Sequence, residues 1–228
     1  MSKANRETSS VEPLVIGVLA SGRGSNLQSI IDAIEQGTLA VRIGVVLSNK
    51  KQAPALERAE GHRIPAIFID PSLYQDRSEY DGAIIQSLQR HHVALVVLAG
   101  YMRLLTHLLT TQYPNRIINI HPSLLPAFPG MHAHRQALAY GVKVSGCTIH
   151  FVDEKVDHGP IIAQASVPVL DGDDEESLSE RILLEEHRLL PRVLQLYADG
   201  KVRVEGRRVH IEGETLAESG TVQRQVNR

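Results

Sequence analysis

The chain has 228 residues, of which 43% are hydrophobic, a length and composition suited to one large globular domain with a sizeable core. Its formal net charge of -2, with both signs interspersed, provides no basic stripe for nucleic acid. One cysteine excludes an internal disulfide, and a polar start without any apolar run long enough to span a bilayer predicts a cytoplasmic protein with no membrane partner.

The first part of the chain alternates apolar runs with amphipathic segments. Residues 14–20 form a continuous apolar run that ends in a glycine-rich turn, as expected of a central parallel strand, and a helix should follow over 25–36. The pattern then repeats, with strands over 41–48, 66–69 and 94–99 and helices over 53–60 and 77–91. This alternation predicts an α/β fold: a doubly wound, mostly parallel sheet flanked by helices.

The second part of the chain predicts fewer crossovers and a hairpin. A short strand over 117–120 is followed by a helix over 131–140, strands over 146–152 and 161–168, and a long amphipathic helix over 177–198. Residues 201–205 and 208–211 alternate like a small C-terminal β-hairpin around Gly206. We therefore expect a single domain over 13–212, with disordered polar ends over 1–12 and 213–228.

Three polar side chains suit one acyl-transfer site. Asn119 and His121 are two apart, so they project from one side of the short strand where it becomes a loop, which is where open α/β sheets place their sites. Acyl transfer needs an oxyanion donor, a proton-moving group and a carboxylate to orient it, and Asn119, His121 and Asp157 match those parts. Ser123 lies between prolines and Cys147 in an apolar strand pattern, so direct attack by a substrate amine is favoured over a covalent acyl-enzyme.

The glycine-rich turn at 22–26 allows two interpretations. Its backbone N–H groups could hold a phosphate at a helix N-terminus, or it could be a tight turn with Ser25 as the N-cap. The spacing is not that of a dinucleotide-binding loop, because Leu27 occupies the third glycine's place, and residues 48–50 offer no acid for a ribose. A single phosphate therefore fits better than a nicotinamide cofactor.

Other polar residues also allow a plain interpretation. Arg103 follows a central strand and could meet an anion or a flat heterocycle, or be a solvated loop charge. Arg77 at a helix start and Glu186 on the long helix could likewise be solvated charges. His132 and His134 are two apart on a predicted helix and point to different sides, so we expect no metal site.

Several separated motifs, in one order along most of the chain, resemble the 10-formyltetrahydrofolate-dependent formyltransferases, and within them the branch that formylates phosphoribosylglycinamide in purine synthesis. They are Ala20-Ser-Gly22-Arg-Gly24-Ser25-Asn26, Leu98-Ala-Gly100-Tyr-Met-Arg103, Asn119-Ile-His121-Pro122-Ser123-Leu-Leu-Pro126, His150-Phe-Val-Asp153-Glu-Lys-Val-Asp157 and Glu185-Glu186-His187. The resemblance implies a Rossmann-like formyltransferase fold with a phosphoribosyl-binding N-terminal half and a folate-binding C-terminal half.

The resemblance also implies an activity. The formyl group of 10-formyltetrahydrofolate would pass to the amine of glycinamide ribonucleotide, giving formylglycinamide ribonucleotide on the route to IMP. Asn119 and protonated His121 would bind the oxyanion, and Asp157 would keep the histidine charged by raising its pKa. No metal or nicotinamide is required, and a monomer or a homodimer is equally compatible.

The resemblance assigns the remaining site residues. Gly24, Ser25 and Asn26 would bind the phosphoribosyl end, and Glu186 would meet the substrate's amine. The folate would contact Arg77, Arg103, Leu104, Leu105, Val152, Asp153, Glu154, Lys155, Val156 and Asp157. Two positions depart from the usual pattern, since Ala127 replaces a frequent lysine and Lys155 a frequent glycine.

Four other functions stay open at this point. Methionyl-tRNA formyltransferases share the signature, but they carry an RNA-binding domain for which this chain has no segment. A formyltetrahydrofolate deformylase would use water as the acceptor and usually has an extra N-terminal domain. A phosphometabolite-binding module without activity is disfavoured by the three catalytic groups. A nicotinamide-dependent oxidoreductase is disfavoured by the glycine spacing.

Overall fold

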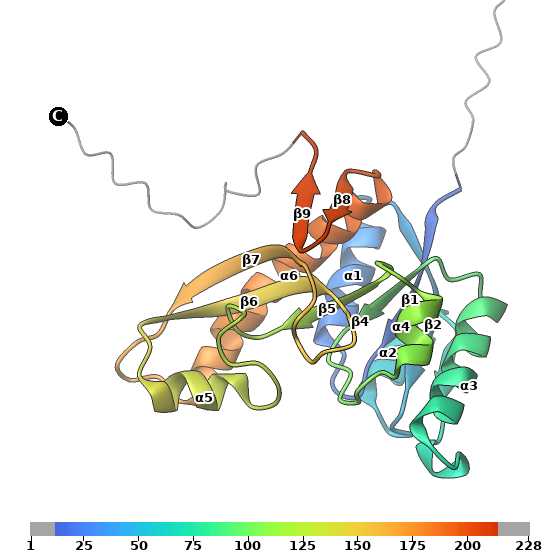
Figure 1. The fold of residues 1–228 in the computed structure, drawn as a ribbon, viewed down its shortest axis with the longest axis horizontal. Helices are drawn as coiled ribbons and strands as arrows, with labels where there is room; N and C mark the ends of the chain where they lie inside the picture. The colour runs from blue at the N-terminus through green and yellow to red at the C-terminus, as the bar shows by residue number, and fades with distance from the viewer. Residues whose placement is uncertain (1–11, 214–228) are drawn as a thin grey trace, which may run out of the picture.

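A seven-stranded sheet forms the centre of the computed structural model, which describes residues 12–213 (Figure 1). The strands are β1 (Leu14–Leu19), β2 (Val41–Ser48), β3 (Ala66–Phe68), β4 (Leu95–Leu98), β5 (Ile117–His121), β6 (Val144–Phe151) and β7 (Ile161–Pro168). They lie in the order β3-β2-β1-β4-β5-β6-β7, and only β6 runs antiparallel to its neighbours. The mostly parallel sheet predicted from the alternation is confirmed. Apart from residues 12 and 213, the expected disordered ends lie outside the described residues.

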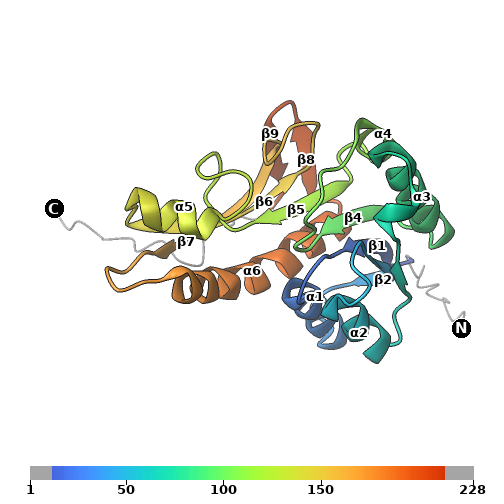
Figure 2. The ribbon, with the colours of Figure 1, turned by 90° about the horizontal axis from the view of Figure 1, so that it is seen from below.

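Helices cover both faces of the sheet, so the doubly wound arrangement is also confirmed (Figure 2). The helices are α1 (Ser25–Glu35), α2 (Pro54–Gly61), α3 (Arg77–Arg90), α4 (His107–Gln112), α5 (Ala133–Tyr140) and α6 (Glu175–Ala198). Ile30 of α1 and Ile182 of α6 belong to the core on one face, and Ile84 of α3 and Leu109 of α4 belong to the core on the other. The helices that the sequence predicted bury apolar side chains against the sheet, as their periodicity indicated.

Several element boundaries differ from the sequence expectation, each for a local reason. Helix α1 has Gly24 as its N-cap residue, in a left-handed conformation, so the interpretation of Ser25 as N-cap is wrong. Helix α5 begins at Ala133 because His132 is also left-handed. Helix α6 begins at Glu175, before position 177, because Asp174 caps it in a reciprocal pair with Ser177.

Two short elements escaped prediction. Helix α4 has six residues and the 3-10 helix Pro71–Leu73 has three, which is too few for a helical apolar period to appear in the sequence. The short 3-10 helix is held by Asp70, whose side chain accepts a hydrogen bond from the amide of Ser72.

The predicted C-terminal hairpin is present beside β7. It consists of β8 (Val202–Glu205) and β9 (Arg208–Ile211), which are antiparallel. Half-buried valines of both strands pack against the same core as α1 and α6. The hairpin is therefore anchored to the body of the domain, and its turn stands near the loop between β6 and β7 (Figure 1).

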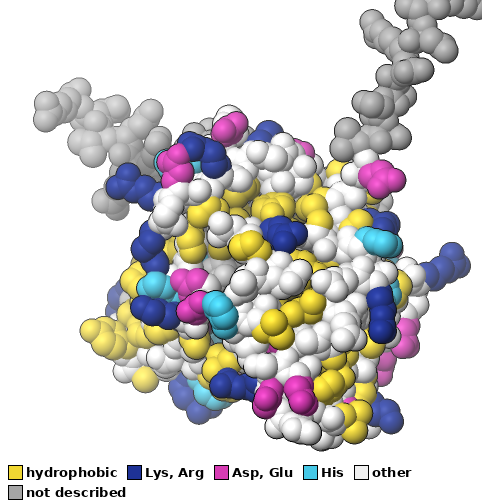
Figure 3. Space-filling view, turned by 45° about the vertical axis from the view of Figure 1, so that its right-hand side comes forward, with side chains coloured by type: hydrophobic (Ala, Val, Ile, Leu, Met, Phe, Trp, Pro, Cys, Tyr) yellow, Lys and Arg dark blue, Asp and Glu magenta, His cyan; other side chains and the backbone are white. Residues whose placement is uncertain are grey.

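The surface shows neither a membrane element nor a basic stripe on the face in view. Among residues 12–213, no helix is both long and apolar enough to cross a membrane. On the face shown in Figure 3, Lys and Arg side chains are scattered among acidic and histidine side chains. Any anionic ligand must therefore be recognised by local groups.

Candidate active site

Asn119 and His121 lie on β5, at the end of the sheet where the carboxyl ends of the parallel strands meet. In the register of β5 with β6, Asn119 lies opposite His150 and His121 lies opposite Thr148. His121 is only 5% exposed, and Asn119 is half-buried. Because β5 has paired neighbours on both sides, the backbone that supports these two side chains is rigid.

Asp157 contacts Asn119, His121 and His150, and these four residues form the Asp157 cluster. Asp157 Oδ2 accepts a hydrogen bond from the amide of Gly130 at 2.7 Å and lies 3.3 Å from His121 Nδ1. Its Oδ1 lies 3.4 Å from Asn119 Nδ2 and 3.7 Å from His150 Nε2. The structure therefore gathers a carboxamide, an imidazole and a carboxylate that are distant in the sequence, as the acyl-transfer interpretation requires.

His150 is a member of the cluster that sequence reasoning missed. It is 1% exposed, and its Nδ1 lies 2.8 Å from the carbonyl of Phe151, to which it donates. In the tautomer with its proton on Nδ1, Nε2 accepts a hydrogen bond from Asn119 Nδ2 at 3.1 Å. This bond fixes the amide orientation of Asn119. The sequence signal was weak, since only the register of β5 with β6 reveals that the two side chains face each other.

The loop after β5 supplies backbone groups to the cluster. The carbonyl of Phe128 lies 2.9 Å from His121 Nε2, and Phe128 adopts a left-handed φ of 54°. Buried polar contacts hold this loop, since Thr148 Oγ1 accepts from the amide of Leu125 at 3.0 Å and Gln164 donates to the Leu125 carbonyl at 2.9 Å. Both ring nitrogens of His121 therefore face fixed oxygen acceptors.

Burial and charge act in opposite directions on the two titrating groups of the cluster. Burial lowers the pKa of His121, and it outweighs the Asp157 charge and the Phe128 carbonyl, which raise it. The expectation that Asp157 would lift the pKa of His121 above its ordinary value is therefore wrong. For Asp157, in contrast, burial raises the pKa, but its hydrogen bonds and the neighbouring histidines outweigh burial and hold the pKa below the ordinary value. Asp157 is thus the charged member of the pair.

Neither candidate nucleophile is available for covalent catalysis. Ser123 is fully buried and its hydroxyl donates to the carbonyl of Ala127 at 2.6 Å. Cys147 is also fully buried, and burial raises the pKa of its thiol to about 12. Neither Ser123 nor Cys147 is therefore placed to form a covalent acyl-enzyme.

The glycine-rich turn brings the start of α1 against α6. Gly24 has a φ of 73°, and a Cβ there would lie 2.8 Å from the Cα of Ala55, so only glycine fits. Asn26 Nδ2 donates to Glu186 Oε2 at 2.7 Å, and Glu186 is 6% exposed. The interpretation of Glu186 as a solvated carboxylate is therefore wrong. Burial, opposed by the Asn26 bond, raises its pKa to about 7.

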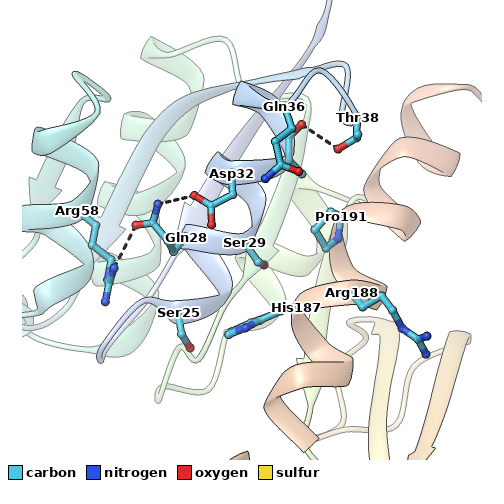
Figure 4. A pocket seen from close by; sticks show the side chains of 11 residues that line it. Ser25, Gln28, Ser29, Asp32, Gln36, Thr38, Arg58, His187, Arg188 and Pro191 are labelled. Carbon is cyan, nitrogen blue, oxygen red and sulfur yellow. Dashed lines mark hydrogen bonds between the residues drawn. The ribbon is translucent and has the colours of Figure 1, made fainter.

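A groove of about 480 Å³ opens between α1 and α6 beside this turn (Figure 4). Ser25 and His187 lie at one end of it, and Gln28 links Asp32 and Arg58 by hydrogen bonds of 2.8 and 3.1 Å. The groove does not include the Asp157 cluster. It is a polar hollow next to the predicted phosphate-binding turn rather than the site of the chemistry.

Two predicted folate-contacting arginines lie on different elements. The guanidinium of Arg103 lies 4.8 Å from the ring centroid of Tyr80 on α3, an arrangement typical of a cation–π contact. Arg77 is the first residue of α3 and is exposed. The structure thus holds Arg103 in one orientation and leaves Arg77 on the surface.

The remaining predicted folate contacts include exposed apolar side chains. Leu104 is 55% exposed and Val156 is 51% exposed, whereas Leu105 and Val152 pack against the α3 side of the core. Glu154 and Lys155 are exposed, and Asp153 is half-buried. Exposed leucine and valine next to a polar cluster are typical of a ligand site.

Among the described residues, no group of three histidine, cysteine or acidic side chains is arranged to hold a metal ion. His134, beside His132 near the start of α5, is half-buried, and its burial lowers its pKa.

The comparisons with known proteins agree on one family. The formyl transferase family model matches residues 15–194. The chain is 40% identical to the phosphoribosylglycinamide formyltransferase of Escherichia coli (strain K12), covering 90% of this chain and 97% of that protein. It is 46% identical to the human trifunctional purine biosynthetic protein adenosine-3 over 83% of this chain, but it spans only 19% of that protein's length.

Solved structures give the same picture. Glycinamide ribonucleotide transformylase 1 from Symbiobacterium toebii is 53% identical, with a TM-score of 0.87 and coverage of 88% of this chain and 95% of that chain. A formyltetrahydrofolate deformylase from Pseudomonas syringae pv. tomato is 30% identical, with a TM-score of 0.81, and the match covers 88% of this chain and 66% of that chain. The acceptor of the formyl group is therefore what separates the nearest candidate activities.

Proposed function

This chain belongs to the formyl transferase family, and we propose that it transfers the formyl group of 10-formyltetrahydrofolate to the amine of glycinamide ribonucleotide in purine synthesis. The observation that carries the proposal is the gathering of Asn119, His121 and Asp157 in a chain that matches the Escherichia coli enzyme over 97% of its length. These groups suit direct attack by an amine on a formyl carbon.

The attack creates a negative oxygen that needs hydrogen-bond donors. Asn119 Nδ2 carries two hydrogens. It donates one to His150 Nε2, 3.1 Å away, and makes a weaker contact with Asp157 Oδ1, 3.4 Å away. The planar amide fixes both hydrogens, so an oxyanion that lies in line with the second one replaces the weak Asp157 contact while the bond to His150 keeps the amide oriented. Asn119 is therefore the primary oxyanion donor.

His121 is the second donor and moves the proton. When the oxyanion forms, its negative charge favours the imidazolium, which donates from Nε2 to the oxyanion in competition with the Phe128 carbonyl. The proton lost by the attacking amine passes to the leaving N10 of the folate through His121 or bound water. The C–N10 bond then breaks, giving formylglycinamide ribonucleotide and tetrahydrofolate.

Asp157 supports His121. Its carboxylate lies 3.3 Å from His121 Nδ1, so it stabilises the imidazolium as the charge develops. Its hydrogen bond from the Gly130 amide joins the loop between β6 and β7 to the loop that follows β5, and so fixes the carboxylate. We assign Asn119, His121 and Asp157 as the catalytic residues on these contacts.

The substrates occupy two ends of the site in this proposal. The phosphoribosyl end of the ribonucleotide binds Gly24, Ser25 and Asn26 at the N-terminus of α1, where backbone N–H groups and the helix dipole favour a phosphate. Glu186, bonded to Asn26, faces the same substrate. The N-terminal half of the domain is thus the phosphoribosyl-binding half.

The folate binds at the C-terminal half. Exposed Leu104 and Val156 offer apolar contacts to its ring, together with Leu105, Arg103 and the loop over 152–157. We propose that Arg77, which is exposed at the start of α3, contacts the carboxylate tail of the folate. The co-substrate supplies the formyl group, and the protein supplies orientation and charge.

One assay separates this activity from its rivals. Purified protein with 10-formyltetrahydrofolate is offered glycinamide ribonucleotide, water alone or initiator tRNA, and the formylated product is measured. We expect transfer to the ribonucleotide at least 100-fold faster than to the other acceptors, because only a bound amine acts at high effective concentration. Equal folate hydrolysis with and without the ribonucleotide would identify a deformylase instead.

A further inference from the structure

The C-terminal hairpin touches the loop that carries Asp157. Arg207 stands at the turn between β8 and β9, and its Nη2 donates to the carbonyl of His158 at 2.8 Å. Its Nη1 lies 3.2 Å from each ring nitrogen of His158, so the guanidinium packs against the imidazole. The contact joins residues 49 positions apart, and it reaches the residue next to Asp157.

Besides the contact with Arg207, few side-chain contacts hold the outer side of the loop between β6 and β7. Asp153 accepts from the amide of Lys155 at 2.9 Å and lies 2.8 Å from His158 Nδ1. Glu154, Lys155 and the apolar Val156 between these points are exposed. Asp153, His158 and Arg207 therefore form one cluster on the outer side of the loop, and Glu154 is held separately by His107 of α4, whose Nδ1 lies 2.7 Å from Glu154 Oε1.

The inner side of the loop presents the catalytic carboxylate in a conformation that needs support. Asp157 has a φ of 48°, in the left-handed region that non-glycine residues seldom adopt. Gly159 lies so close to β6 that a Cβ there would be 1.8 Å from the carbonyl of Phe151. The peptide between these residues carries the carbonyl that Arg207 holds.

We infer that Arg207 is a positioning residue for the proposed reaction: by holding the His158 peptide, it keeps the Asp157 carboxylate against His121. The base of the hairpin is anchored by half-buried valines of β8 and β9, so the guanidinium has a fixed support. Arg207 does not touch the reacting atoms. It acts through the loop, and a small displacement there costs rate because the donors must be aligned.

The test compares Arg207→Ala with Arg208→Ala, which removes the same charge from the adjacent position. We expect Arg207→Ala to lower kcat about tenfold while leaving the KM for glycinamide ribonucleotide unchanged, since that substrate binds at α1. Arg207→Lys should restore part of kcat, because an ammonium can reach the carbonyl but cannot pack flat on the ring. Arg208→Ala should behave like the wild type.

A second readout needs no substrate. NMR titration of the His121 ring in the whole protein should give a lower pKa in Arg207→Ala than in Arg208→Ala, because a displaced carboxylate raises it less. Thermal unfolding midpoints of the two variants should agree within about 4 °C, since the contact is on the surface. The inference rests on the proposed function for its kinetic readout only. Identical His121 titration in the two variants would overturn it, whatever activity the protein has.

Discussion

Asn26 and Glu186, 160 positions apart, form a buried hydrogen bond of 2.7 Å between the first turn of α1 and the middle of α6. The bond satisfies the amide nitrogen of Asn26, while its Oδ1 has no protein partner. Burial raises the pKa of Glu186 to about 7 from an ordinary value of 4.5. A carboxyl that titrates near neutrality therefore lies where the ribonucleotide is proposed to bind.

This pair predicts a specific dependence of stability on pH. Because the folded pKa of Glu186 is raised, its contribution to the unfolding free energy is fully present below about pH 4.5 and is lost as the pH rises through 7. The difference in unfolding free energy between the wild type and Glu186→Gln should fall by up to about 3 kcal/mol from pH 5 to pH 8. Urea unfolding at both pH values measures it. Glu180→Gln, on the exposed side of α6, is the control, and a parallel pH response in both variants would contradict the prediction.

The contact between Asp157 and His121 predicts a lower imidazole pKa when the carboxylate is neutralised. In Asp157→Asn the Coulombic effect that raises the pKa of His121 is lost, while burial, which lowers it, persists. NMR titration should therefore place the His121 midpoint below its wild-type position, and kcat should fall about 100-fold or more. Asp171→Asn, at an exposed ion pair with Lys143, should change neither quantity. An unchanged His121 midpoint would show that the two groups do not interact.

The two hydrogens of Asn119 Nδ2 predict sensitivity to an isosteric change. Asn119→Ala should lower kcat about 100- to 1,000-fold, as is typical of losing one oxyanion donor. Asn119→Asp at pH 8 should be at least as damaging, because it replaces a donor by an acceptor 3.4 Å from the Asp157 carboxylate. Steady-state kinetics with both substrates, beside circular dichroism to show that the fold is kept, would decide. Asp at this position with near-normal turnover is incompatible with the donor role.

Gly159 predicts a steric effect on the Asp157 loop. A methyl group at this position would meet the carbonyl of Phe151 at 1.8 Å, so Gly159→Ala must displace the peptide that follows Asp157. We expect kcat to fall tenfold or more, with a destabilisation of about 1 to 3 kcal/mol. Gly172→Ala, where a Cβ meets nothing within 4 Å, is the matched control. Activity and melting temperature measured together test this, and equal behaviour of the two alanine variants would refute it.

Much of the site was accessible from the sequence because its signals are local. Asn119 and His121 are two apart on a short strand, and that spacing alone places them on one side. The absence of a usable nucleophile followed from the prolines around Ser123 and the apolar surroundings of Cys147, and the structure buries both. The partners of these residues were inaccessible, since His150, the Phe128 carbonyl and the Gly130 amide carry no pattern of their own.

The sequence by itself determined the alternation of strands and helices, the sheet class and the hairpin, because side-chain periods of 2 and 3.6 residues are properties of neighbouring positions. Only the tertiary structure decided that Asn119 faces His150, that Glu186 is buried against Asn26, and that burial lowers the pKa of His121. Strand register, helix packing and burial join residues far apart in the chain, and the balance between desolvation and charge exists only once they meet.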